Sequence, residues 1–172
     1  MTRTRIMATV TAVAAIVGIG AAAGNPNWST TLTGYGEVPA QSTTAGGSFS
    51  ASISDDESTI SWQLTYEVPG ITQSHLHFGQ PSVNGGISVF LCTNLGNGPA
   101  GTQACPANSG TISGIWSAAD VVGPAGQGIA AGELSELIAA IRSGNVYANI
   151  HTTAVPAGFV RGQLAPGKGH GD

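Results

Sequence analysis

Apolar and polar residues alternate in two neighbouring segments, 46–54 and 59–68, on either side of an acidic turn at 55–58. A period of two is typical of a β-strand with one buried face. Two such strands around a short turn predict a β-hairpin. The apolar positions are Phe49, Ala51 and Ile53 in the first segment and Ile60, Trp62, Leu64 and Tyr66 in the second.

Six further segments are short, carry at least one apolar face and are bounded by turn residues, as strands are. We expect Leu32 and Tyr35, in segment 28–38, to contact the core. We expect the same of Ile112 and Trp116 in segment 110–117. The six segments are 28–38, 73–79, 87–92, 110–117, 146–152 and 159–164.

One segment, 133–142, has the spacing of an amphipathic helix instead. Gly144 follows it at a position that suits a helix C-terminal cap. We therefore predict an all-β fold, an antiparallel Greek-key β-sandwich of about eight strands with one short helix over its end. The apolar residues of the helix are Leu134, Leu137, Ile138 and Ile141.

The composition agrees with this class and excludes one kind of partner. A length of 172 residues suggests one domain. Charged residues are 8% of the chain and the net charge is −4. Without a basic cluster, we expect no nucleic-acid partner.

The first 23 residues resemble a signal peptide. Arg3 and Arg5 precede an uncharged run from 6 to 23 that ends in Ala21-Ala22-Ala23, an A-x-A pattern. The alternative is an uncleaved membrane anchor. We expect cleavage, a secreted, periplasmic or cell-envelope location, and no membrane span afterwards. The expected divisions are signal peptide 1–23, linker 24–30, domain 31–165 and flexible tail 166–172.

Cys92 and Cys105 are the two cysteines of the chain. In an exported protein such a pair predicts a disulfide. The alternative is a pair of thiolate metal ligands, which the wide spacing disfavours.

Three histidines lie at matching positions of two predicted strands. In 73–79, His75 and His77 alternate with apolar residues, and His151 ends a second alternating segment. If both apolar faces point to one core, the three imidazoles emerge on the same side of the sheet. Three imidazoles suit copper or zinc, and the residues alone do not choose between them. The alternative is that the histidines only form hydrogen bonds across strands.

Two further polar residues could support this site. Asn149 could orient an imidazole. Arg161 lies on a nearby strand, and we expect it to pair with a carboxylate such as Glu37 or Glu67. His170 is a less favoured fourth metal ligand. No nucleophile motif such as G-x-S-x-G occurs, so we predict no catalytic residues and favour a non-enzymatic protein.

Five motifs in order resemble the CHRD domain, a family named for chordin and found in exported bacterial proteins. The resemblance implies a β-sandwich and no established enzymatic activity. The motifs are Gly36-Glu37-Val38-Pro39-Ala40, Ser74-His75-Leu76-His77-Phe78-Gly79, Glu133-Leu134 with Ile138-Ala139-Ala140-Ile141-Arg142-Ser143-Gly144, Val146-Tyr147-Ala148-Asn149-Ile150-His151-Thr152 and Arg161-Gly162-Gln163-Leu164.

The histidine pattern is also distantly similar to copper/zinc superoxide dismutase, and this likeness, with the expected export, favours copper over zinc for His75, His77 and His151. No histidine lies between His77 and His151 to bridge a second metal, and the zinc-ligand cluster is missing. Three functions therefore remain open: a metal-binding exported protein, a structural or interaction module with a protein or polysaccharide partner, and a mononuclear copper enzyme of dismutase type.

Overall fold

The computed structural model describes residues 28–167, so the expected signal peptide, most of the linker and the end of the tail lie outside it. Within that range no helix is long and apolar enough to cross a membrane. The helical elements are α1 (Leu134–Arg142) and the 3-10 helices η1 (Gly34–Gly36), η2 (Ala118–Asp120) and η3 (Ala125–Gln127). The strands are β1 (Trp28–Thr33), β2 (Gly46–Ile53), β3 (Ile60–Glu67), β4 (Ile71–Phe78), β5 (Gly86–Thr93), β6 (Ser109–Trp116), β7 (Val146–Thr152), β8 (Val160–Gln163) and β9 (Ala165–Pro166).

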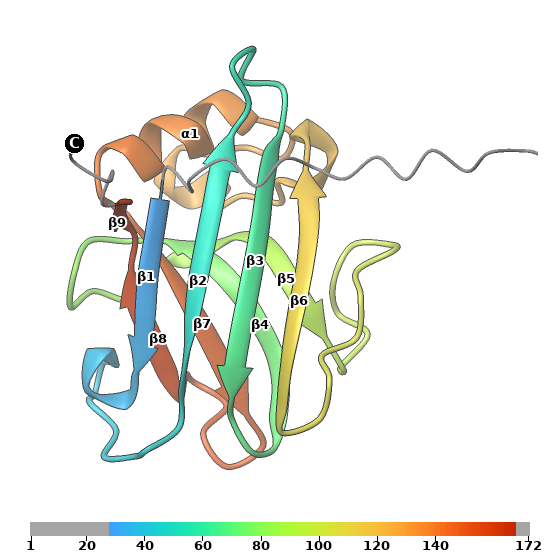
Figure 1. Ribbon diagram of the computed structural model, residues 1–172. Coiled ribbons are helices and arrows are strands. Elements are labelled where there is room, and N and C mark those ends of the chain that lie inside the picture. The colour runs from blue at the N-terminus through green and yellow to red at the C-terminus, as the bar shows by residue number, and fades with distance from the viewer. Residues whose placement is uncertain (1–27, 168–172) are drawn as a thin grey trace, which may run out of the picture.

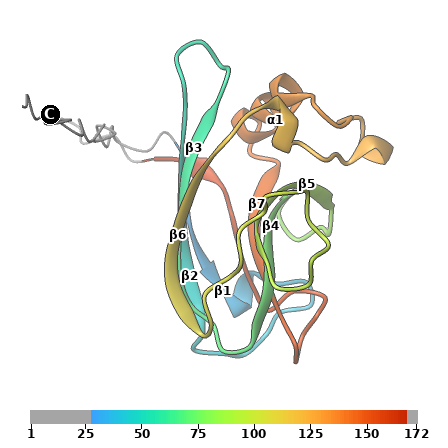
Figure 2. The same ribbon diagram turned by 90° about the vertical axis from the view of Figure 1, so that its right-hand side faces the viewer.

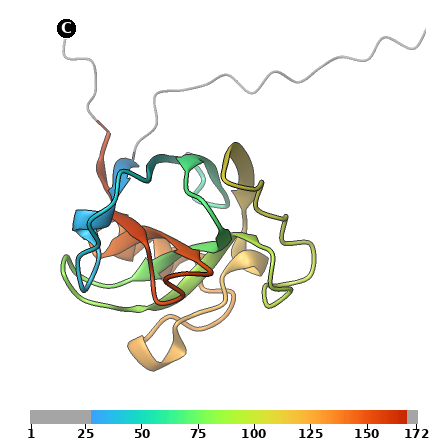
Figure 3. The ribbon, with the colours of Figure 1, turned by 90° about the horizontal axis from the view of Figure 1, so that it is seen from below.

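The strands form two packed layers, and every pairing between them is antiparallel (Figures 1 and 2). The strand order is β5-β4-β7-β8-β1-β2-β3-β6, and β9 pairs with β1. The β8–β1 pairing joins the layers along one side, so that seen from below the strands surround a common interior (Figure 3). The predicted all-β sandwich is confirmed.

The chain passes from one layer to the other and back in a Greek-key manner. It leaves β3 for β4 and β5 in the second layer, then returns to place β6 beside β3, with Ile112 opposite Leu64. The predicted hairpin is confirmed as β2–β3, where Phe49 is opposite Leu64. Because alternate residues face the core, β3 is buried at every second position.

One core prediction was wrong. Leu32 is buried as expected, but the side chain of Tyr35 is 73% exposed. Strand β1 ends at Thr33, and the chain turns into η1 before it reaches Tyr35. Strand alternation therefore does not extend to that residue.

The predicted helix is confirmed as α1, which lies across one end of the sandwich (Figure 1). Leu137 and Ile141 of this helix are completely buried. Gly144 follows with a φ of 74°, a left-handed conformation that glycine adopts without steric cost. The helix thus closes the core at that end.

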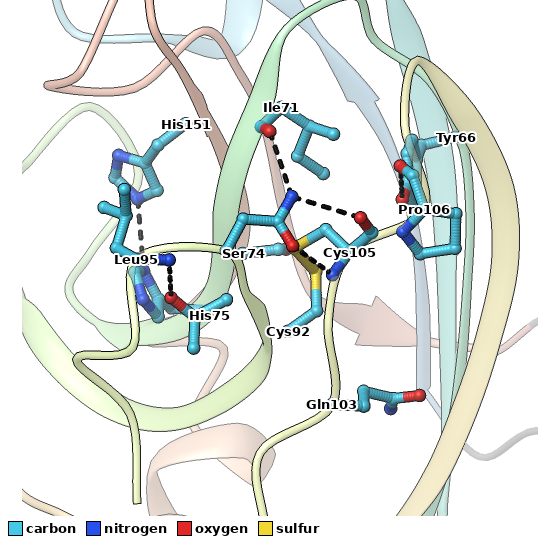
Figure 4. Close-up of a disulfide and its surroundings, with 12 residues drawn as sticks. Tyr66, Ile71, Ser74, His75, Cys92, Leu95, Gln103, Cys105, Pro106 and His151 are labelled. Carbon is cyan, nitrogen blue, oxygen red and sulfur yellow. Dashed lines mark hydrogen bonds between the residues drawn. A yellow bond between two sulfur atoms is a disulfide. The ribbon is translucent and has the colours of Figure 1, made fainter.

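Strands β5 and β6 are the two ends of the strand order, and the segment between them bridges this open side. The Trp116 indole donates to the Phe90 carbonyl at 3.1 Å. The Thr93 amide donates to the carbonyl of Gln103 at 3.0 Å, and the Gln103 side chain donates to Ser113 at 3.2 Å. The Cys92–Cys105 disulfide crosslinks the same segment (Figure 4).

Removing this disulfide should destabilise the protein. The double variant Cys92→Ser/Cys105→Ser opens a loop with a sequence separation of 13 residues. The released chain entropy of the unfolded state predicts a loss of about 3 kcal/mol. Urea unfolding of the variant and of the reduced wild type tests this, and both should lose similar stability. An unchanged midpoint in both would contradict the prediction.

Candidate metal centre

Strands β4 and β7 are neighbours, and their register brings the three histidines together. His75 is opposite Asn149, His77 is opposite Tyr147, and His151 is opposite Gln73. The alternate residues Leu76, Ala148 and Ile150 face the core, so the imidazoles project from the opposite face of the sheet. Figure 4 shows the rings of His75 and His151 directed toward each other.

The imidazole nitrogens nearly converge. His75 Nδ1 lies 3.2 Å from His151 Nε2, and one ligand atom from each ring lies within 4.8 Å of the others. Metal–nitrogen bonds of about 2.0–2.1 Å place two ligand nitrogens roughly 3.3–3.5 Å apart. The His75–His151 pair already has this spacing. A pair at the 4.8 Å limit has to close by a little over ~1 Å, which small side-chain rotations can supply.

The outer face of this sheet is enclosed. His75, His77 and His151 are 0%, 7% and 6% exposed. The Phe90 and His75 rings pack nearly perpendicular with centroids 4.4 Å apart, and Tyr147 stacks on His77 at 5.0 Å. Alternation along the strands predicted a shared face, but not that other side chains and loops would cover it.

Two main-chain carbonyls fix the tautomers of two histidines. Gly85 accepts a hydrogen bond from Nδ1 of His77, and Pro156 accepts one from Nδ1 of His151, each at 3.0 Å. Because a carbonyl only accepts, both Nδ1 atoms carry the proton and both Nε2 atoms carry a lone pair. This is the arrangement that orients imidazoles bound to metal ions.

Two nitrogens of the cluster have no partner within residues 28–167. In this range Nε2 of His75 and Nε2 of His77 are buried and form no hydrogen bond. Leaving a buried polar atom unpaired costs about 1–3 kcal/mol. Such an atom calls for an explanation, and for Nε2 of His77 a bound ion is one of the recognised explanations. His75 meets His151 through Nδ1, so an ion shared by these two rings would not use Nε2 of His75.

Burial keeps the three rings neutral. Loss of solvation lowers the pKa of His75 to about 2, and neighbouring His151 and His77 lower it further. Loss of solvation likewise lowers the pKa of His77 to about 4 and lowers the pKa of His151. Since only neutral imidazole binds a metal ion, all three rings have the charge state of ligands at neutral pH. Because Nε2 of His151 carries a lone pair, Nδ1 of His75 donates to it, and this proton has to move to Nε2 of His75 before Nδ1 can bind an ion.

The side chain of Asn149 lies beside the cluster but is bonded elsewhere. Its amide nitrogen donates to Glu37 at 2.5 Å and to the Val160 carbonyl at 2.9 Å. Glu37 is 6% exposed, and this burial raises the pKa of its carboxyl group. The hydrogen bonds that orient imidazoles come instead from Gly85 and Pro156. The sequence did not predict the roles of Gly85 and Pro156, because they act through main-chain carbonyls and every residue has one.

The guanidinium of Arg161 reaches the cluster through an aromatic ring. It lies 4.1 Å from the centre of the Tyr147 ring, which stacks on His77. It donates to the Asn84 side chain at 3.0 Å and to the Val83 carbonyl at 3.2 Å. Arg161 thus holds the loop whose Gly85 carbonyl meets His77.

The expected ion pair of Arg161 with Glu37 or Glu67 does not form. Within residues 28–167 the one ion pair joins Arg142 to Glu57, and it is exposed. Glu37 is nevertheless close enough to Arg161 for their charges to interact. The carboxylate of Glu37, which we expected to pair with Arg161, instead accepts a hydrogen bond from Asn149.

Replacing Arg161 by methionine should loosen this loop. The variant loses two hydrogen bonds from a buried charged donor, each worth about 1.5–3 kcal/mol. We expect a loss of about 3 kcal/mol in unfolding free energy, the lower end for two such bonds, and faster amide hydrogen exchange in residues 80–86. Arg161→Lys keeps the charge but not the planar fork. It should lose less stability; equal losses in both variants would argue against the fork geometry.

A family model for the CHRD domain matches residues 28–164. The chain belongs to the CHRD domain family. No curated protein and no solved structure matches the chain. The family expected from five short motifs is therefore confirmed, and the histidine cluster of this CHRD domain lies within the matched residues.

Proposed function

We propose that this CHRD domain is an exported protein that binds a transition metal ion through His75, His77 and His151, with copper favoured and zinc the alternative. The observation that carries the proposal is the enclosed group of three neutral imidazoles whose ligand atoms lie within 4.8 Å of one another, one of them, Nε2 of His77, without a hydrogen-bond partner among the described residues. Imidazole is a common ligand for both metals.

Hydrogen bonding alone accounts poorly for this cluster. A purely structural role would be expected to satisfy the buried nitrogens, as in most protein interiors. Here one direct contact joins two histidines, whereas Nε2 of His75 and of His77 lack partners. Coordination would use the lone pair on Nε2 of His77, which has no partner among the described residues.

The disulfide supports export. Cys92 and Cys105 are joined, and such bonds persist mainly in oxidising compartments. This agrees with residues 1–23 acting as a signal peptide and with a secreted, periplasmic or cell-envelope location. Delivery or sequestration of the metal needs only binding, so no enzymatic activity is required.

A dismutase-type copper enzyme is less well supported. Its substrate would have to reach the metal, whereas the three ligand side chains are at most 7% exposed. An interaction module without metal remains the alternative, and it is an outcome of the following test.

Metal titration of the purified, metal-stripped protein tests the proposal. Competition with chelators of known affinity should reveal one tight site for Cu(II) or Zn(II). His75→Ala/His77→Ala should bind at least about 100-fold more weakly, because it removes two of three ligands. His170→Ala, which changes a histidine outside the described residues, should bind as the wild type does.

Circular dichroism and thermal unfolding of each metal-free variant separate loss of ligands from loss of fold. Metal at 100 times its Kd should stabilise the wild type by about 2.7 kcal/mol and leave the double variant unchanged. Equal, weak binding by the wild type and the folded double variant would leave only the interaction module.

A further inference from the structure

We propose that the histidine centre is a three-coordinate site for monovalent copper, Cu(I), rather than for a divalent ion. The inference rests on the proposed metal binding and adds the oxidation state and the coordination number. Three features of the site support it: the number of ligands, the charge of the surroundings and the enclosure of the rings.

Among the histidines, cysteines and acidic residues of the described part of the chain, three supply a donor to this point. No fourth His, Cys, Asp or Glu within residues 28–167 joins the cluster. Zinc in proteins is almost always four-coordinate, and a three-ligand zinc site keeps a water in its fourth position. His75 is completely buried, and Nε2 of His77 is also buried. Bulk water therefore reaches a fourth coordination position only if the residues that enclose the histidines move. A three-coordinate ion needs no such water ligand.

No anionic ligand offsets the charge of the metal. The three donors are neutral imidazoles, and the Arg161 cation lies over Tyr147, which stacks on His77. The buried carboxyl group of Glu37 is hydrogen-bonded to Asn149 and is not part of the cluster. The Born cost of burying an ion rises with the square of its charge, so a divalent ion costs about four times as much as a monovalent ion of equal size. The surroundings therefore favour the lower charge.

The described residues give this site no sulfur ligand that could select Cu(I) among metal ions. The two cysteines are joined in the disulfide, and the two methionines, Met1 and Met7, belong to the expected signal peptide. Soft sulfur ligands, which usually select Cu(I), are thus not what this site uses. Ligand number and charge carry the preference instead.

Phe90 packs against the cluster on the side that faces an open pocket. Its ring packs nearly perpendicular to that of His75 at 4.4 Å, and the same residue lines an open pocket of about 320 Å³ between β5 and β6. Shortening this side chain should connect the pocket to the histidines. Water would then supply a fourth ligand and favour the divalent ion.

The test compares both oxidation states of copper on the purified, metal-stripped protein. Cu(I) affinity is measured without oxygen against a coloured Cu(I) chelator, and Cu(II) and Zn(II) affinities are measured against chelators of known strength. We expect Cu(I) to bind at least about 1,000-fold more tightly than Cu(II). By 59 mV per tenfold for one electron, the reduction potential of bound copper would then lie about 180 mV above that of the free ion. X-ray absorption should show three nitrogen ligands near 2.0 Å.

Two Phe90 variants provide an internal control. Phe90→Ala should lower the ratio of Cu(I) to Cu(II) affinity at least tenfold, whereas Phe90→Leu, which retains most of the apolar side chain, should change it little. Equal ratios in all three folded proteins would overturn the role of enclosure. Tighter binding of Cu(II) or Zn(II) than of Cu(I) through the histidines would overturn the inference and leave the proposed function intact. If none of the three ions bound, the proposed function itself would fail.

Discussion

Lowering the pH from 7 to 4.5 should cost the metal-free protein roughly 5 kcal/mol of unfolding free energy through two histidines. Burial lowers the pKa of His75 to about 2 and that of His77 to about 4 in the folded protein. In the unfolded chain both titrate near 6.5. Between these values the unfolded chain takes up protons that the folded protein cannot, so stability falls as the pH falls.

The expected loss is large beside the total stability of a domain, about 5–15 kcal/mol. Each histidine contributes about 1.36 kcal/mol per pH unit below roughly 6.0. The lowered pKa of His151 acts in the same direction. The raised pKa of Glu37 acts in the opposite direction, because its folded carboxyl group binds a proton more readily than the unfolded one, and it offsets part of the loss.

Urea unfolding at half-unit steps from pH 7 to pH 4.5 measures this slope. His77→Gln provides the matched control, since it removes one titrating ring from the cluster while keeping a polar side chain of similar length. Its slope below pH 5.5 should be smaller by about 1.4 kcal/mol per pH unit. A wild-type stability that stays flat over the whole range would show that the rings are protonated in the folded protein.

Replacing Trp116 by alanine should cost about 3–5 kcal/mol. The side chain is 3% exposed and stacks on Trp62 and Phe49, with ring centroids 5.0 Å and 6.2 Å apart. Its indole also donates the hydrogen bond to Phe90 that joins β6 to β5. The variant therefore loses core packing and a link across the open side of the sandwich.

Trp116→Phe separates the two contributions, because it retains an aromatic ring and removes the donor. It should lose roughly 1–2 kcal/mol, from the hydrogen bond and the smaller ring. Chemical unfolding of both variants gives the comparison. If Trp116→Phe were as unstable as Trp116→Ala, the hydrogen bond would outweigh the packing.

Much of the fold followed from local patterns. Strand β3 repeats apolar residues at every second position over its whole length, and its burial follows the same period. Such a pattern is readable because a strand has only two faces. The prediction for Tyr35 was wrong where the regular pattern ended: the chain left the strand at Thr33, and alternation no longer applied.

The amino-acid sequence by itself determined the strands, the helix, the cysteine pair and the shared face of His75, His77 and His151, because these depend on periodicity and residue type. Only the tertiary structure decided that this face is enclosed. It also decided that the Gly85 and Pro156 carbonyls accept hydrogen bonds from the imidazoles. The hydrogen bond from Asn149 to Glu37 is likewise a result of tertiary packing. These contacts join residues through loops and main-chain atoms. Main-chain carbonyls are alike in every residue, so their positions come from the packing of the whole chain and leave no signature in the sequence.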